Sequence, residues 1–344
     1  MSSTSAHSFK KVAVILLNWN GCQDTLECIS SLYACDWPNT VIYVGDNGST
    51  DHSVQAIRSA FPKCRLLELG QNFGFAEGCN KVVEVALQEG ADYIFYLNND
   101  TVVDPNLISI LVESHEKLGP RVCLGCNIGY VSSPEITWDF GAIWDPSRGV
   151  YHKVGRDQAM ALHQEVVEVD HVIGCAMFFS AETLRETGLF DRRFFLNYEE
   201  TDLCMRARKM GVRFYSIPEA KLWHKISASF EGKLHNYYYC ERNRGLWMKK
   251  HFSFMERLKW YFLRGRFKKN IVNFLKSILY IVSLPLWICS RARRAKVFSY
   301  LVTRFVGVIA VCHHLMGRYG PGPLWVLKAN KQVEAWRKIS CQKQ

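Results

Sequence analysis

Polar side chains follow four apolar runs of the sequence, and each set is rich in Asn, Asp and Gly. The four sets are residues 18–21 (NWNG), 46–51 (DNGSTD), 72–80 (NFGFAEGCN) and 98–101 (NNDT). A single set of this kind is more readily explained as a tight turn, because Asn and Asp beside Gly favour turn conformations. Four sets that follow successive strands of one parallel sheet would meet at one edge, and they favour a ligand site there.

The residue types in these sets indicate what the ligand is. The carboxylate of Asp46 can accept a hydrogen bond from the N–H of a base such as uracil or thymine. Gly74 and Gly78 allow a phosphate to approach the free N–H groups at a helix start. Asp100 is a hard oxygen ligand suited to Mg2+ or Mn2+ on a diphosphate. The sequence therefore predicts a nucleotide-diphosphate site, to which we also assign the amides Asn18, Asn20, Asn47, Asn72, Asn80, Asn98 and Asn99.

Alternating apolar runs and helical patterns place these sets on a sheet. The predicted strands are residues 12–18, 41–46, 65–69 and 93–97, and the predicted helices between them are residues 25–33, 53–60 and 76–88. Uninterrupted apolar runs are typical of strands buried on both faces. This order predicts an α/β fold with a mostly parallel sheet and right-handed crossovers.

The pattern of apolar residues is less regular from about residue 122 to residue 169, and no helix or strand is assigned there. The elements predicted beyond it are a strand at 172–179, a helix from the N-cap Ser180 to about Gly188, a helix at 200–210, a short strand at 214–217 and helices after Tyr237.

The composition and the absence of certain motifs argue against several classes of protein. Hydrophobic residues make up 48% and charged residues 22%, as in ordinary folded proteins. The 13 cysteines are scattered and odd in number, which favours a reducing cytosol. Cys123 and Cys126 form a CxxC without a second pair, so we expect buried thiols rather than a zinc or redox site. Neither the GxGxxG fingerprint nor a P-loop is present.

Charge divides the chain into an acidic body and a basic C-terminal part. Residues 1–241 hold 21 Lys and Arg against 30 Asp and Glu, whereas residues 242–344 hold 22 against 2. The apolar stretches 271–289 and 302–316 are interrupted by polar residues, so amphipathic helices on an anionic membrane surface are expected rather than spanning helices. The densest basic cluster is Arg291, Arg293, Arg294 and Lys296.

These patterns predict a flexible N-terminus at residues 1–9, an α/β domain at 10–235, which the resemblance described below implies is catalytic, and a helical, basic, membrane-associating region at 236–344. The predicted location is cytoplasmic, on the inner face of the cell membrane. Nucleic acid is the competing partner for a basic region, but no recognised nucleic-acid-binding module accompanies the charge. We therefore expect no nucleic-acid partner.

The order and spacing of the motifs resemble family 2 glycosyltransferases of the GT-A fold, specifically the rhamnosyltransferase-like branch. The resemblance covers residues 10–245 and begins with LLNWNG, GDNGSTD, QNFGFAEGCN and YLNNDT. The later matching segments are 174–177 (GCAM), 188–191 (GLFD), 195–203 (FLNYEETDL) and 218–224 (PEAKLWH).

The resemblance implies roles for individual residues. Asp46 would bind the nucleobase, and Asn72, Gly74 and Asn80 would lie along the nucleotide. Asp100 and His224 would hold Mg2+ or Mn2+, although the first position of the metal motif is Asn98 instead of a carboxylate. The resemblance places the catalytic base in the acidic segment 199–202, where we favour Glu200 over Glu199 and Asp202.

The alternative explanation of that acidic segment is a solvated helix N-terminus, where acids are favoured by the helix dipole. Arg242, in the segment YYYCERNR that also resembles the branch, has two open interpretations. Its guanidinium would contact a donor or acceptor phosphate, or it would form a buried ion pair with the acidic body.

The implied reaction is a metal-dependent, inverting sugar transfer by a single displacement. The favoured donor is dTDP-L-rhamnose, and the favoured acceptor is a hydroxyl of a polyprenyl-diphosphate-linked saccharide in cell-surface polysaccharide assembly. Galactosyl, N-acetylglucosaminyl or other hexosyl transfer from a UDP-sugar is the alternative reaction. A non-catalytic sugar-nucleotide-binding protein and a nucleotide-sugar hydrolase are alternatives of other classes.

Overall fold

The structure is a computed structural model that describes residues 9–226, 234–263, 291–326 and 329. It divides into two compact units. The first unit contains residues up to 145, then 151–192 and 199–227. The second unit contains residues 146–150, 193–198 and the chain from 228 onward. Two short internal segments thus belong with the C-terminal part of the chain.

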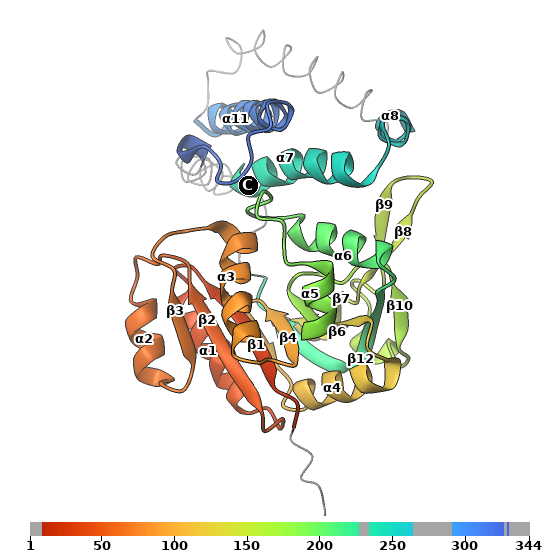
Figure 1. Cartoon of the computed structure of the whole chain (residues 1–344). Helices are drawn as coiled ribbons and strands as arrows, with labels where there is room; N and C mark the ends of the chain where they lie inside the picture. Colours follow the sequence, from red (N-terminus) through yellow and green to blue (C-terminus); the bar gives the residue numbers. More distant parts are fainter. Residues whose placement is uncertain (1–8, 227–233, 264–290, 327–328, 330–344) are drawn as a thin grey trace, which may run out of the picture. The chain divides into compact units, whose positions relative to one another are not determined.

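The first half of the first unit is the predicted parallel sheet with its crossover helices (Figure 1). Its strands are β1 (Val12–Asn18), β2 (Thr40–Asp46), β3 (Arg65–Glu68) and β4 (Tyr93–Leu97). Its helices are α1 (Cys22–Tyr33), α2 (Ser53–Ala60) and α3 (Gly74–Gln88). The strands pair in parallel in the order β4-β1-β2-β3, so their carboxyl ends lie at one edge.

The second half of the unit extends the same sheet beyond β4. Its strands are β5 (Thr101–Val103), β6 (Val122–Tyr130), β7 (Ser133–Asp139), β10 (Val167–Val169), β11 (Ala176–Ser180) and β12 (Arg213–His224). β11 runs antiparallel between β4 and β6, and β12 runs parallel to β6. β8 (Ala142–Asp145) and β9 (Val150–Lys153) form a separate hairpin.

The sequence left elements of this half undetected. Residues 122–169, to which no helix or strand was assigned, hold β6 to β10 and the 3-10 helix Met160–Leu162. The predicted short strand 214–217 is the first part of β12, which continues to His224 beyond a register shift between Ile217 and Lys221. Pro218 lies within that shift, where the missing N–H of proline is tolerated.

Side chains alternate along the buried strands and fill a core on each face of the sheet. Val12, Val14 and Leu16 of β1 pack with α1, α2 and α4 (Leu107–Leu118). Ala13 and Ile15 point the other way and pack with α3, α5 (Ala181–Thr187) and α6 (Glu199–Lys209). The first unit is therefore a helix–sheet–helix arrangement, as its alternating pattern predicts.

The predicted ends of α5 are confirmed. The hydroxyl of Ser180 accepts a hydrogen bond from the backbone N–H of Thr183 at 3.2 Å, as an N-cap does. Gly188 follows the last helical residue with a φ of +75°, a conformation that favours glycine.

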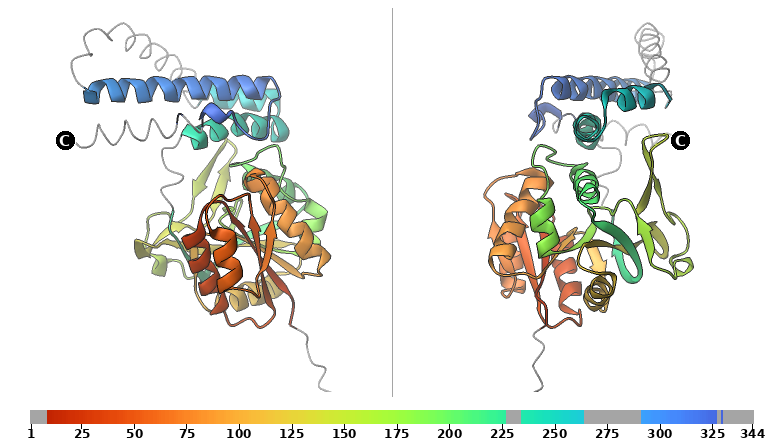
Figure 2. Two further views of the ribbon diagram at one scale, coloured as in Figure 1. Left: turned by 90° about the vertical axis from the view of Figure 1, so that its left-hand side faces the viewer. Right: turned by 45° about the vertical axis from the view of Figure 1, so that its right-hand side comes forward.

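The second unit is built around a pair of helices that lie side by side (Figure 2). They are α7 (Leu234–His251) and α11 (Arg291–Leu315), and α8 (Phe254–Leu263) follows α7. Leu234 and Tyr238 of α7 share a core with Val306 and Ala310 of α11. None of the helices described here is both long and apolar enough to cross a membrane. Residues 1–8 and 271–289 lie outside the described ranges.

Candidate active site

The ends of β1 and β2 are joined by the side chain of Asn18. Its amide donates to Oδ1 of Asp46 at 2.8 Å and to Oγ of Ser49 at 3.1 Å. Oδ2 of Asp46 accepts from the backbone N–H of Ser49 at 3.0 Å. Asn18 is fully buried, so it holds Asp46 in place and offers no surface to a ligand. Each oxygen of Asp46 accepts one of these bonds and keeps a further lone pair, and the residue is 3% exposed.

A second set of amides shapes the start of α3. Oδ1 of Asn47 accepts from the backbone N–H of Phe73 at 2.9 Å, and its amide donates to the carbonyl of Gly74 at 3.1 Å. Oδ1 of Asn72 accepts from the N–H of Gly74 at 2.8 Å. Gly74 has a φ of +80°, which a residue with a Cβ rarely adopts. This turn delivers the free N–H groups of α3 to the edge of the sheet.

Further hydrogen bonds connect the other predicted edge residues. Oδ1 of Asn20 accepts from the N–H of Thr50 at 2.7 Å, closing the loop after β2. The amide of Asn99 donates to Oγ1 of Thr25 at 2.8 Å, and that hydroxyl donates to Oδ1 of Asn18 at 2.9 Å. The structure thus brings the polar segments after β1, β2 and β4 into one continuous network.

Asn80 is occupied by the backbone of Phe190. Its amide donates to the Phe190 carbonyl at 2.8 Å, and its oxygen accepts from the Phe190 N–H at 3.0 Å. Asn80 is only 7% exposed. It was predicted to lie along the nucleotide, but both ends of its amide hold the turn after α5.

Asp100 and His224 meet at the end of the sheet. β5 begins directly after Asp100 and pairs with the end of β12, so that Thr101 lies opposite His224. Nε2 of His224 lies 2.9 Å from Oδ1 of Asp100 and 3.5 Å from the amide of Asn98. The ring of Trp138 packs on the His224 ring, with 4.7 Å between centroids.

The geometry of this pair fits a divalent cation. Neighbouring ligands of an octahedral ion with bonds of about 2.1 Å are about 3 Å apart, close to the observed spacing of the two atoms. The described residues contain no group of three or more His, Cys, Asp or Glu side chains that could hold a metal. Asp100 and His224, which contact each other directly in this structure, are thus the two candidate metal ligands, with the amide of Asn98 beside them.

Glu199 and Glu200 begin α6 and lie among buried groups. Glu199 is 5% exposed, and its Oε2 has no hydrogen-bond partner. Burial and the neighbouring Glu200 raise the pKa of Glu199 well above 4.5. Burial also raises the pKa of Glu200, whose side chain is 18% exposed. The burial of these two side chains rules out the alternative explanation, a solvated helix N-terminus.

The segment Gly174-Cys175 lies close to Glu200 and also to Asp100. A Cβ on Gly174 would lie 3.1 Å from Cβ of Glu200, so the glycine allows close packing there. The carbonyl of Cys175 accepts from the backbone N–H of Asn98 at 2.9 Å. Burial and then Asp100 raise the pKa of Cys175. One short segment, Gly174-Cys175, is therefore close to both Glu200 and Asp100.

Asp202 and Arg242, two other predicted site residues, have structural partners instead. Asp202 is fully buried and accepts from Nε of Arg206 at 2.9 Å, and Arg206 donates in turn to the carbonyl of Leu189 at 2.6 Å. Arg242 is also fully buried, and its guanidinium bonds to carbonyl oxygens rather than facing solvent or an acid. The positions of these two residues favour neither a base nor a phosphate ligand.

His171 lies beside the acidic start of α6 and was not singled out from the sequence. Its Nε2 lies 3.3 Å from Oγ1 of Thr201 and 3.8 Å from Oε1 of Glu200. Burial and nearby Lys153 lower the pKa of His171 to about 3, so its ring is neutral. The lone histidine precedes β11 by several residues and has no motif around it, so only the folded structure identifies it.

Replacing Glu199 with glutamine is expected to raise the melting temperature, and most at high pH. Because the pKa of Glu199 is higher in the folded state, the ionised carboxyl destabilises the fold as pH rises from 4.5 through the raised value. Each unit of the elevation is equivalent to about 1.4 kcal/mol, and glutamine removes this loss. Melting temperatures measured from about pH 5 to about pH 8 should diverge with rising pH. A pH-independent difference between the two proteins would contradict this, and Glu219→Gln, at an exposed position, is the control substitution.

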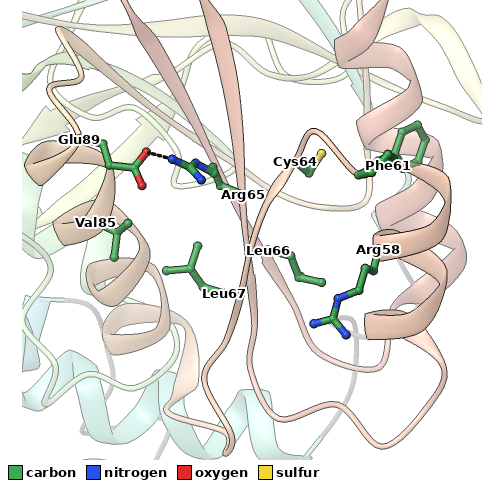
Figure 3. Close-up of a pocket in the computed structure, with 9 residues that line it drawn as sticks. Arg58, Phe61, Cys64, Arg65, Leu66, Leu67, Val85 and Glu89 are labelled. Carbon is green, nitrogen blue, oxygen red and sulfur yellow. Dashed lines mark ion pairs between the residues drawn. The ribbon is translucent and has the colours of Figure 1, made fainter.

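A surface cavity of about 340 Å³ lies elsewhere, along β3 between α2 and α3 (Figure 3). It is lined by the end of α2, the start of β3 and the end of α3. These features lie at the amino ends of the strands, whereas the polar network lies at their carboxyl ends. Arg65 at this cavity is paired with Glu89 at 3.2 Å. The cavity contains none of the predicted site residues.

Comparisons with known proteins identify the family. The model for glycosyl transferase family 2 matches residues 13–187. An N-acetylglucosaminyl-diphospho-decaprenol L-rhamnosyltransferase of Mycobacterium tuberculosis is 27% identical over 204 residues, which are 53% of this chain and 66% of the relative. The dTDP-rhamnosyl transferase RfbF of Shigella flexneri is 21% identical over 55% of this chain and 60% of its own length. The matches span slightly less than two thirds of these relatives.

Solved structures agree on the fold. A mannosyltransferase of Pyrobaculum calidifontis, in complex with GDP-Man and Mn2+, has a TM-score of 0.53 at 14% identity, covering 90% of this chain and 88% of its own. GalNAc-T7 with UDP, GalNAc and Mn2+ has a TM-score of 0.51 at 14% identity, covering 69% of this chain and 48% of its own. The chain belongs to glycosyl transferase family 2, has the GT-A fold and is similar to rhamnosyltransferases.

Proposed function

We propose that the protein is an inverting glycosyltransferase that moves a sugar from a nucleotide diphosphate to an acceptor hydroxyl. The observation that supports the proposal is that one short segment, Gly174-Cys175, lies close to two acidic groups. Glu200 packs against Gly174, and Asp100, which contacts His224, lies near Cys175. A displacement with inversion needs leaving-group stabilisation and a base on opposite faces of the sugar.

The donor would lie along the polar network at the carboxyl edge of the sheet. Asp46 would accept the N–H of the base, and the N–H groups at the start of α3 would meet the diphosphate. Asp100 and His224 would hold Mg2+ or Mn2+, with the amide of Asn98 beside them. When bound, the cation supplies positive charge that stabilises the departing diphosphate. The rhamnosyltransferase names of two relatives support dTDP-L-rhamnose as the donor.

Glu200 would act as the base. Its side chain is partly exposed, whereas Glu199 is nearly fully buried, so an acceptor hydroxyl can reach Glu200 more easily. The raised pKa of Glu200 makes the carboxylate a stronger proton acceptor than an ordinary glutamate. His171 beside Glu200 is neutral, so it adds no charge to the site.

The test is a transfer reaction with a polyprenyl-diphosphate-linked N-acetylglucosamine acceptor, the chemistry that the mycobacterial relative is named for. Purified enzyme, dTDP-L-rhamnose and Mn2+ should give a saccharide product whose anomeric configuration, measured by NMR, is opposite to that of the donor. Retention of configuration would refute the proposed mechanism. Sugar release to water at the same rate with and without acceptor would indicate a hydrolase instead.

An apolar face on the second unit supports the proposal that the protein binds a membrane surface. Phe305, Val308 and Leu315 project from α11 with exposed fractions of 58%, 59% and 76%. Leu324 is 75% exposed, and the ring of Trp325 lies 5.7 Å from that of Phe305. Exposed apolar side chains within a strongly basic region suit the surface of an anionic bilayer, where a lipid-linked acceptor would be found.

The double substitution Val308→Asp and Leu315→Asp is expected to weaken binding to anionic phospholipid vesicles by at least about tenfold. Both side chains are exposed, so the fold should tolerate the change. The matched control is Leu162→Asp with Val166→Asp, which adds the same charge at exposed apolar positions of the first unit. Vesicle co-sedimentation measures both variants. Equal loss in both would show a general charge effect and contradict a membrane-binding face on α11.

A further inference from the structure

The segment that leads into α6 has a strained backbone. Phe195, Asn197 and Tyr198 have φ values of +64°, +67° and +72°. Such conformations are uncommon for residues other than glycine, and for bulky aromatic residues they cost free energy that the surroundings must offset. The strained segment ends directly before Glu199, the first residue of α6.

Asn243 of α7 binds this segment through its backbone. Its side-chain amide donates to the carbonyls of Phe194, Leu196 and Asn197 at 2.7, 2.8 and 2.8 Å. The amide has two hydrogens for three acceptors, so at least one hydrogen is shared. Oδ1 of Asn243 accepts from Nε of Arg242 at 2.9 Å, which fixes the orientation of the amide. Asn243 is fully buried.

Arg242 reinforces the same contacts. Its guanidinium donates to the carbonyl of Phe194 at 2.9 Å and to the carbonyl of Gly320 at 2.6 Å. It also lies over the ring of Tyr239, 4.9 Å from the centroid. The planar fork of the guanidinium serves acceptors in several directions, which the ammonium of lysine would not reproduce. Two adjacent side chains of α7 therefore bind the strained segment and the turn after α11.

We propose that Arg242 and Asn243 are positioning residues that hold segment 194–198, with its three left-handed residues, and thereby place Glu199 and Glu200 for sugar transfer. The inference rests on the proposed function of these acids. Both residues act through backbone carbonyls. The apolar contacts of Leu234 and Tyr238 with α11 join the two helices independently of Asn243. The C-terminal region thus contributes to catalysis as well as to membrane binding.

The principal test is Asn243→Asp, which keeps the shape and the oxygen that Arg242 needs but removes the donors to the three carbonyls. The expected result is a fall in kcat on the order of 100-fold, because small displacements of reacting groups have effects of this size. The KM for the donor should stay within about twofold, because the donor network belongs to the first unit. A purely structural defect would lower the active fraction, which active-site titration by bound nucleotide detects.

The control is Arg244→Gln on the same helix. Arg244 is paired with Glu241 at 2.9 and 2.6 Å, and its loss should leave kcat unchanged. If Asn243→Asp does not fold, Arg242→Lys is tested instead. The same result is expected for it, a fall in kcat with a nearly unchanged KM for the donor. An unchanged kcat in the folded variant, or a matching fall for Arg244→Gln, would overturn the proposal.

A second measurement does not depend on activity. Amide hydrogen exchange across 194–198 should be faster in Asn243→Asp than in the wild type, while exchange in the buried strands of the first unit is unchanged. Unchanged exchange in the segment would overturn the proposal. If the wild-type protein transfers no sugar but the segment still responds, the proposed function fails while the holding role of Asn243 stands.

Discussion

Replacing Asp100 with alanine is expected to lower kcat by about 1000-fold and to abolish the stimulation of turnover by Mn2+. The carboxylate lies 2.9 Å from Nε2 of His224, at the spacing of two neighbouring metal ligands. Without Asp100, only His224 is left of the two candidate ligands for the metal. A metal that stabilises the departing diphosphate contributes several kcal/mol, and losing that contribution lowers the rate by about this factor. Steady-state assays with and without chelator measure the effect on turnover.

Metal binding can be measured apart from catalysis. Titration calorimetry of Mn2+ into the protein with a nucleoside diphosphate should show binding for the wild type and none for Asp100→Ala. The matched control is Asp104→Asn at the far end of β5, where the carboxylate accepts from the N–H of Asn106 at 2.9 Å. This control should retain both binding and turnover. Mn2+-stimulated turnover in Asp100→Ala would show that Asp100 is not a metal ligand.

Replacing Glu200 with glutamine is expected to lower kcat by about 100-fold to 10,000-fold while donor binding is kept, because the group that accepts the proton is lost. The dependence of kcat on pH in the wild type should reflect the ionisation of Glu200. Only the ionised carboxylate accepts a proton, and burial raises its pKa above 4.5, so kcat should fall with decreasing pH at a value higher than for an ordinary glutamate.

Glu199→Gln is the comparison that separates the two acids. Glu199 is nearly fully buried, and its substitution should reduce kcat less than that of Glu200 while stabilising the protein at high pH. Initial rates across the pH range, with donor affinity from equilibrium binding, measure both variants. A larger loss for Glu199→Gln would assign the base to Glu199.

Much of the first unit could be predicted because its strands are buried on both faces. The bounds predicted for β1, α2 and β4 agree with the structure. The strands β6 to β10 escaped prediction because polar and small residues interrupt their apolar patterns. β6, for example, contains Gly125 and the fully buried Asn127, whose oxygen accepts from the hydroxyl of Thr137 at 3.0 Å.

Which residues lie at the carboxyl edge of the sheet could be predicted, but what each side chain contacts there could not. Carboxyl ends of parallel strands converge, so residues such as Asp46 and Asp100 could be grouped from the sequence. Whether an amide faces a ligand or a backbone carbonyl depends on tertiary partners that leave no local pattern. Asn18, Asn80 and Arg242 therefore proved to hold other parts of the protein.

The most direct test of the central claim is binding of nucleotide sugars at the polar edge of the sheet. Titration calorimetry with dTDP-, UDP- and GDP-sugars in Mn2+ should show one preferred donor, and Asp46→Ala should weaken its binding by about tenfold or more, as expected for loss of a hydrogen bond to a charged group. Acceptor should then trigger release of the nucleoside diphosphate. Failure of every donor to bind the folded, Mn2+-supplied protein would contradict the assignment of this edge as a sugar-nucleotide site.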